Sequence, residues 1–156
     1  MNAITNTENK KIVMLCKHGD SSRIIYHRLA QHFHIDKVIM EDSVSKKTMI
    51  QRRIKKLGFI TLMGQLVFQV VICKFLKKSG RARIAEIKQE FDLNTSEMPA
   101  DKVTEVNSVN SDTTYQLLQD LNPDVVVVNG TRIISKRILE CCDAVFINTH
   151  AGITPR

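Results

Sequence analysis

Short apolar runs separated by polar turns recur through most of the chain, and stretches with helical spacing lie between them. The runs are five or six residues long, which is typical of strands buried on both faces, at 11–16, 35–40, 102–106, 124–128 and 144–148. Amphipathic spacing predicts helices at 23–33, 113–121 and 133–141. Strands that alternate with helices are typical of an α/β fold. We therefore expect one domain over the whole chain, built on a Rossmann-like, open and mostly parallel sheet of about five strands.

The alternation breaks between the second and third expected strands. Residues 57–76 carry a single charge, at Lys74, and polar residues recur in this run at every fourth position, which predicts a helix with one thin polar stripe. Helical patterns flank the run at 48–56 and 81–91. We therefore expect a basic and apolar helical insertion at 46–91, within the domain that the strands form.

Basic residues are concentrated in this insertion. Of the 23 Lys and Arg residues, 11 lie at 46–83, where none of the 16 Asp and Glu residues occurs. Such a segment indicates an anionic partner, so one hypothesis is a non-catalytic module that docks on an anionic membrane or a phosphorylated partner through 46–83. Nucleic acid is not favoured, because the segment has no Tyr or Trp on which bases could stack.

The apolar run at 57–76 is long enough to span a bilayer, but a single crossing would place the two halves of one sheet on opposite sides of the membrane. Peripheral membrane contact through 57–76, with the helix lying on the surface, fits the sequence better. Packing into the protein's own core, or into the interface of a homo-oligomer, is the alternative. The sequence leaves these environments open.

Composition indicates a cytoplasmic protein. The first residues are polar and contain no apolar signal-peptide region. The four cysteines show no metal-ligand spacing, and the adjacent pair Cys141 and Cys142 suits neither a zinc site nor a simple disulfide. We therefore expect free thiols in a reducing cytoplasm.

The last expected strand leads directly into polar residues. Asn148 and His150 are two positions apart, so on an extended backbone their side chains point to the same side. In open parallel sheets, ligands bind at the carboxyl ends of the strands. An amide and an imidazole at that edge are suited to stabilising a developing oxyanion and to accepting a proton. We expect both residues to be catalytic and to lie near the turns that follow the first and fourth strands.

The segment Asn148-x-His150-Ala-Gly152-x-x-Pro155-Arg156 resembles the active-site signature of the folate-dependent formyltransferases, a family that includes the methionyl-tRNA, glycinamide ribonucleotide and amino-sugar enzymes. The resemblance implies a formyltransferase N-terminal domain that moves a formyl group from 10-formyltetrahydrofolate to a primary amine. The acceptor that it implies is a small molecule, an amino sugar carried on a nucleotide or a lipid. Asn148 and His150 occupy the catalytic positions of that signature.

Two further turns carry the same resemblance. The run from Arg132 to Ser135 is similar to the family loop whose backbone holds the pterin ring, which implies cofactor contacts at Asn129, Gly130, Arg132, Ile133 and Ile134. The turn after the first expected strand is similar to the family's substrate loop, which implies substrate contacts at Gly19, Asp20, Ser21 and Ser22. The charge of Asp20 favours a hydroxyl or an amine over a phosphate there. We also expect one of the two serines to cap the following helix.

The family's pattern places an Asp a few dozen residues beyond the His, and the sequence ends at Arg156 before that position. We therefore expect the 156 residues to form the front part of the family's catalytic domain, to bind folate weakly and to transfer no formyl group at a useful rate. We also expect residues 145–147 to form an unpaired sheet edge, which favours self-association.

Overall fold

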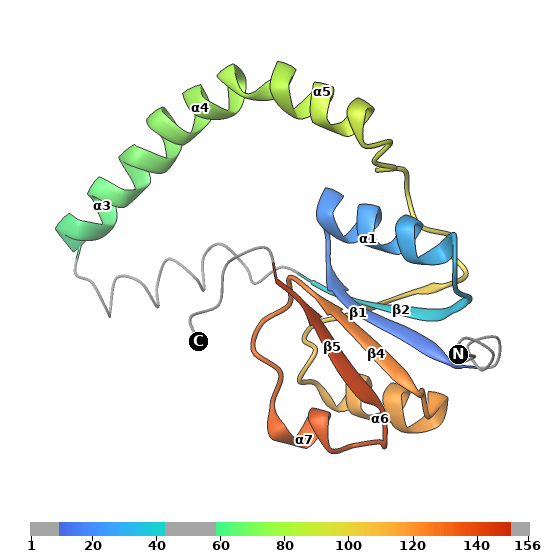
Figure 1. Cartoon of the computed structure of the whole chain (residues 1–156). Helices are drawn as coiled ribbons and strands as arrows, with labels where there is room; N and C mark the ends of the chain where they lie inside the picture. The colour runs from blue at the N-terminus through green and yellow to red at the C-terminus, as the bar shows by residue number, and fades with distance from the viewer. Residues whose placement is uncertain (1–9, 43–58, 151–156) are drawn as a thin grey trace, which may run out of the picture. The chain divides into compact units, whose positions relative to one another are not determined.

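The structure is a computed structural model that describes residues 10–42 and 59–150. The chain divides into two compact units (Figure 1). The sheet unit consists of Met1–Ser43 and Asn94–Arg156, and the helical unit consists of Val44–Leu93. In the order of the chain, the helical unit is thus inserted between the second and third strands of the sheet unit.

Five parallel strands form the centre of the sheet unit (Figure 1). They pair in the order β3-β2-β1-β4-β5, and their bounds are β1 Ile12–Lys17, β2 Ile35–Glu41, β3 Val103–Val106, β4 Val125–Asn129 and β5 Val145–Thr149. Each strand lies where an apolar run predicts one, which confirms the Rossmann-like parallel sheet. Strands of such a sheet are covered on both faces, and the first five residues of β1 are accordingly all buried.

Helices cover both faces of the sheet, and their bounds are α1 Asp20–Ala30, α6 Asp112–Leu121 and α7 Lys136–Leu139 (Figure 1). On one face, Tyr26 of α1 joins a core cluster with Met14 of β1. On the other face, Leu118 of α6 and Ile138 of α7 join a second cluster with Leu15. Neighbouring residues of β1 belong to different clusters because side chains along a strand alternate between its faces.

The strand order reverses between β1 and β4. From β1 the chain proceeds outward through β2 to β3, and from β4 it proceeds outward in the other direction to β5. At such a reversal the connections leaving the two central strands go to opposite faces, which opens a crevice at the carboxyl edge of the sheet. The turns that follow β1 and β4 therefore meet at the place where this fold class binds its ligands.

β5 is the outermost strand on its side of the described sheet, as the sequence predicts. Its side chains alternate, so Val145 and Ile147 remain 61% and 50% exposed, while Phe146 is half-buried against the α6 and α7 side.

α1 begins earlier than the spacing predicts. Its first residue is Asp20, and its N-cap is Gly19, whose φ of 149° a residue with a side chain rarely adopts. Ser21 and Ser22 therefore lie inside the first turn, and the prediction that one of them caps the helix is wrong. The Ser22 hydroxyl instead donates to the carbonyl oxygen of Lys17 at 2.6 Å.

α7 is much shorter than the helix predicted at 133–141, which is also wrong at its start. Asn110 holds residues 133–135, which precede α7, in an extended form. Its side-chain amide donates to the carbonyl oxygen of Ile133 at 2.9 Å, and its side-chain oxygen accepts from the backbone N–H of Ser135 at 2.8 Å. These two bonds take the place of helical backbone bonds. The result is an extended loop between β4 and α7 at the carboxyl edge.

The helical unit is built from α3 Phe59–Val67, the π-helix η1 Phe68–Ile72, α4 Cys73–Ser79 and α5 Arg81–Glu90 (Figure 1). The first three follow one another without a break, so they form a single helix over Phe59–Ser79, called the long helix below. The helices predicted at 57–76 and 81–91 are thereby confirmed, whereas the one predicted at 48–56 lies outside the described residues. Among the helices that are described, none is long and apolar enough to cross a membrane.

Candidate active site

Asn129, the last residue of β4, connects three turns at the carboxyl edge of the sheet. Its side chain is buried, and its amide nitrogen lies 2.9 Å from the hydroxyl of Ser22 and 3.3 Å from that of Ser21. Its side-chain oxygen accepts from the hydroxyl of Thr149 at 2.7 Å. The turns after β1, β4 and β5 are thus joined by one amide.

These bonds use both donors and the acceptor of the Asn129 side chain. The resemblance places Asn129 among the cofactor contacts, but in the structure its side chain is engaged within the protein. Gly130, the next residue, has a φ of 67°, in the left-handed region that favours glycine. The two residues therefore set the direction in which the loop leaves β4.

Arg132 is anchored by a carboxylate that the sequence did not single out. Glu41 ends β2 and is only 2% exposed. One of its oxygens lies 2.5 Å from Nε of Arg132 and also accepts from the backbone N–H of Val109 at 2.9 Å. The other oxygen accepts from the backbone N–H of Arg132 at 3.2 Å. A buried charge requires such partners, and these bonds fix the start of the loop against β2.

The loop between Gly130 and Ser135 is thus held at both ends. Glu41 binds its first half, and Asn110 binds the backbone of its second half. Neither anchor was among the predicted site residues. The signal for Glu41 was a charge directly after the apolar run 38–40, since a carboxylate there is rarely buried without a partner. Nothing in the sequence marked Asn110.

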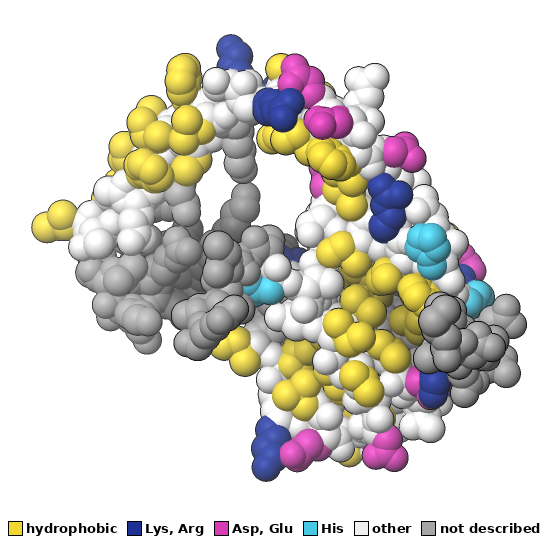
Figure 2. Space-filling view, in the orientation of Figure 1, with side chains coloured by type: hydrophobic (Ala, Val, Ile, Leu, Met, Phe, Trp, Pro, Cys, Tyr) yellow, Lys and Arg dark blue, Asp and Glu magenta, His cyan; other side chains and the backbone are white. Residues whose placement is uncertain are grey.

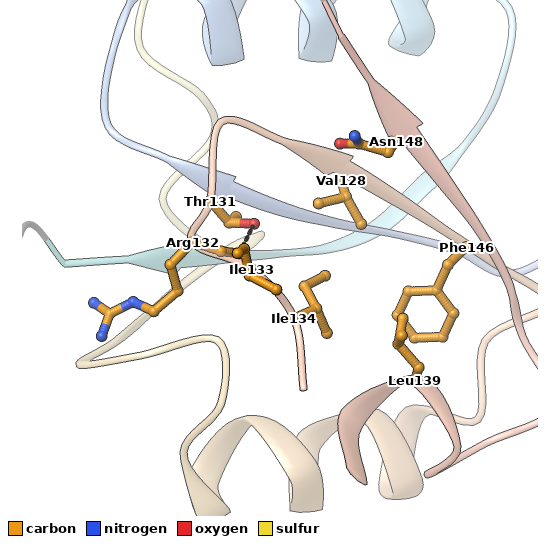
Figure 3. Close-up of a pocket in the computed structure, with 8 residues that line it drawn as sticks. All are labelled: Val128, Thr131, Arg132, Ile133, Ile134, Leu139, Phe146 and Asn148. Carbon is orange, nitrogen blue, oxygen red and sulfur yellow. Dashed lines mark hydrogen bonds between the residues drawn. The ribbon is translucent and has the colours of Figure 1, made fainter. Parts of the chain in front are cut away.

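A cavity of about 450 Å³ lies between this loop and β5 (Figure 3). It is lined by Val128, Thr131, Arg132, Ile133, Ile134, Leu139, Phe146 and Asn148. Phe146 and Leu139 lie against each other at one end, and the guanidinium of Arg132 extends away from the cavity (Figure 3). Most of the lining is therefore apolar, with Thr131, Arg132 and Asn148 as its polar residues.

Asn148 is exposed on β5, opposite Val128 of β4 in the register. His150 follows the end of β5 directly and is also exposed, but it is not among the residues that line the cavity. Both residues lie at the carboxyl edge of the sheet, where the sequence predicted them. The remaining residues of the signature, Gly152, Pro155 and Arg156, lie outside the described residues.

The predicted substrate loop follows β1, whereas the cavity lies between β5 and the loop that follows β4. Ser21 and Ser22 contact Asn129, whereas Gly19 and Asp20 are exposed at the start of α1. Asp20 lies 3.9 Å from the guanidinium of Arg23 in the same helix. None of these four residues lines the cavity beside β5.

A second hollow, of about 400 Å³, opens on the α1 side of the sheet. Its lining consists of His18, Met40, Glu97, Met98, Ala100, Val103 and Glu105. Each carboxylate of this set has a cationic neighbour: Glu97 bonds to Arg23, and Glu105 lies 3.5 Å from the His18 ring. The two hollows belong to opposite faces of the sheet, since Met40 and Val128 fall into different core clusters.

Comparison of the sequence with models of known protein families, and with curated proteins, finds no match.

Proposed function

We propose that the cavity beside β5 binds the pterin end of 10-formyltetrahydrofolate and that the protein's site serves formyl transfer to a primary amine. One observation supports this most directly. Arg132 to Ile134 and Asn148 were singled out for separate reasons, as a pterin-binding loop and as a catalytic amide, and both line the same cavity.

The shape and chemistry of the cavity suit a flat heterocycle. Val128, Ile134 and Phe146 provide apolar walls for the faces of a ring. A pterin carries alternating donors and acceptors on its edge, and these would bind backbone groups of the loop other than the N–H of Arg132 and Ser135 and the C=O of Ile133, which Glu41 and Asn110 already bind. Because the loop is bound at both ends by Glu41 and Asn110, it is pre-organised, which lowers the entropic cost of binding.

In the proposed reaction, the nitrogen of the acceptor amine attacks the formyl carbon, and the C=O electron pair moves to the oxygen. The Asn148 amide donates a hydrogen bond to that oxyanion. His150 accepts the proton that the attacking amine loses. Collapse of the intermediate breaks the bond between the formyl carbon and N10, and the electron pair and the proton pass to N10. The amino-sugar acceptor and the folate donor rest on the resemblance, and the roles of the two residues rest on their chemistry and place.

Donor binding is tested first, separately from formyl transfer. We expect 10-formyltetrahydrofolate to bind weakly in titration calorimetry and to shift the amide resonances of 131–134. Ile134→Ser should weaken binding by about tenfold, since it removes an apolar wall of the cavity. Ile84→Ser, which makes the same change at an exposed position of α5, should leave binding unchanged. Equal effects of the two substitutions, or shifts confined to other residues, would refute the site.

Transfer is measured separately with a panel of amino-sugar nucleotides. Any turnover should be lost in Asn148→Ala and His150→Ala but kept in His32→Ala, a histidine outside the site. Turnover that survives the loss of His150 would assign the proton transfer to another group.

A further inference from the structure

The long helix exposes a continuous apolar side. Ile60, Met63, Val67, Val71 and Phe75 are spaced by three or four residues, and their side chains are between 44% and 86% exposed. Figure 2 shows hydrophobic side chains over much of the visible surface of this helix. An exposed apolar stripe of this length is uncommon in a soluble protein and marks an interaction surface.

The π-helix at Phe68–Ile72 determines which residues share that side. A π turn inserts one extra residue, so it rotates all following side chains back by about 100° relative to an uninterrupted α-helix. In an uninterrupted α-helix each four-residue step rotates the side chain by about 40°, so Phe75 would lie about 80° away from Val67. With it, the two lie within about 20° of each other. The apolar side therefore continues straight through α4.

The same turn also moves Lys74 away from the apolar side. Lys74 is nine residues beyond Gln65, so in a regular α-helix the two would lie about 180° apart. The π turn reduces this angle to about 80°, and it places Phe75 about 180° from Gln65. By the same arithmetic Lys78 lies about 120° from Gln65, so the two lysines lie between the stripe that Thr61 and Gln65 begin and the apolar side. The sequence spacing predicts one thin polar stripe, and the π turn keeps Phe75 on the side opposite to it.

The charge of this surface selects the partner. Lys74, Lys78 and Arg81 are exposed, and no Asp or Glu occurs between Phe59 and Arg83. A second copy of the same helix in parallel register would bring Lys74, Lys78 and Arg81 of the two copies together at one end, which opposes that arrangement. An anionic lipid surface matches both the apolar side and the lysines of the long helix, since its acyl region accepts apolar side chains and its headgroups attract lysines. The long stems of lysines also allow their ammonium groups to reach the headgroups.

We propose that the long helix lies flat in the interface of an anionic membrane. The side that carries Val67, Val71 and Phe75 enters the acyl region, and Lys74 and Lys78 bind the phosphate headgroups. This inference does not depend on formyl transfer.

The first test measures binding of the full chain to vesicles by sedimentation. We expect binding to an equal mixture of phosphatidylcholine and phosphatidylglycerol and much weaker binding to phosphatidylcholine alone. Lys74→Gln with Lys78→Gln should lower the partition coefficient by on the order of 20-fold, and Phe75→Ser by about tenfold. Lys136→Gln and Val145→Ser, which are matched exposed changes in the sheet unit, should have little effect.

The second test uses the absence of tryptophan from the chain. In Phe75→Trp the only indole lies in the apolar side, so its fluorescence should shift to the blue with anionic vesicles and be quenched by brominated lipid. Phe33→Trp, at an exposed position of the sheet unit, should show neither change.

Two outcomes would overturn the proposal. One is failure of the wild-type chain to bind anionic vesicles. The other is binding to a soluble polyanion such as polyuridine with equal strength and no dependence on Phe75, which would assign the basic residues to nucleic acid or another phosphate-bearing partner.

Discussion

The sheet unit and the helical unit use apolar residues in opposite ways. In β1, Val13, Met14 and Leu15 are fully buried, whereas in the long helix Ile60 and Phe75 are 86% and 70% exposed. The difference arises because a parallel strand has two faces that helices cover, while the described part of the helical unit has no sheet of its own. Apolar composition alone therefore does not decide whether a residue is buried, as in β1, or exposed, as in the long helix.

Polar groups differ in the same way. In the sheet unit, Glu41 and Asn129 are buried and hydrogen-bonded, and no buried side-chain nitrogen or oxygen within 10–42 and 59–150 is left without a partner. In the long helix, Gln65 and Lys74 are exposed to solvent. Buried hydrogen-bonded pairs fix the geometry of the sheet unit, because a buried polar group without a partner costs free energy. Exposed polar residues define only which side of the long helix faces water.

Cysteine reactivity should show the largest contrast between the two units. Burial raises the pKa of the Cys16 thiol to about 11, and the side chain is fully buried, whereas Cys73 in the long helix is half-exposed. We expect maleimide to label Cys73 about a thousandfold faster than Cys16 near neutral pH, since labelling of Cys16 requires the sheet to open. Peptide mapping by mass spectrometry separates the sites. In strong denaturant the two rates should converge, and similar rates in the native state would contradict the contrast in burial.

A matched pair of leucines compares the two environments in free energy. Leu15→Ala should lower the free energy of unfolding by about 3 kcal/mol, because it leaves a cavity in the centre of the sheet. Leu76→Ala, at a position 58% exposed, should change it by less than about 0.5 kcal/mol. Urea unfolding followed by circular dichroism measures both. A loss for Leu76→Ala as large as for Leu15→Ala would show that the long helix is packed in solution.

Within the sheet unit, the buried carboxylate of Glu41 and the exposed carboxylate of Glu105 should differ in their effect on stability. Glu41→Gln should cost about 2 kcal/mol, because an amide has one acceptor oxygen for the donors that the two carboxylate oxygens now serve. It should also weaken folate binding by releasing Arg132 and the loop. Glu105→Gln is the control, since Glu105 is an exposed carboxylate beside His18. Unchanged stability in Glu41→Gln would mean that the loop does not depend on this ion pair.

The smallest effect is expected at the amino edge of the sheet. The side-chain bond from Lys10 at 2.9 Å and the backbone bond from Lys11 at 2.8 Å lower the pKa of Asp124 from its ordinary 3.8. Folding therefore favours the deprotonated form. The contribution of Asp124 is fully present above its ordinary pKa and is lost as the pH falls through the lowered value. Asp124→Asn should slightly lower stability at neutral pH, and the difference from wild type should vanish in strong acid. Thermal unfolding of the wild type and of Asp124→Asn across acid pH tests this, and a difference that persists in strong acid would contradict it.

Local patterns were sufficient for most of the fold. The strands and the helices of the sheet unit were predictable because a buried strand needs a short apolar run and an amphipathic helix needs a repeat near 3.6. The placement of Asn148 and His150 at the carboxyl edge followed as well, since every strand end in a parallel sheet lies on the same edge.

Predicted helix boundaries were wrong where a distant side chain or a glycine conformation outweighed the local pattern. The spacing at 133–141 is helical, but Asn110 binds the backbone of Ile133 and Ser135 and keeps the chain extended. At α1, a glycine with positive φ starts the helix before the apolar spacing begins. A local pattern contains no information about a partner that is distant in the chain.

The sequence by itself thus determined the parallel sheet, the order of its elements and the chemical types available at its edge. Only the tertiary structure decided how that edge is assembled. Glu41 and Arg132 come from different strand ends, and Asn129 joins three turns, because buried polar groups must find partners wherever the fold brings them. The π turn likewise moves Lys74 away from the side of the long helix that carries Val67 and keeps Phe75 on it, since one inserted residue rotates everything that follows it.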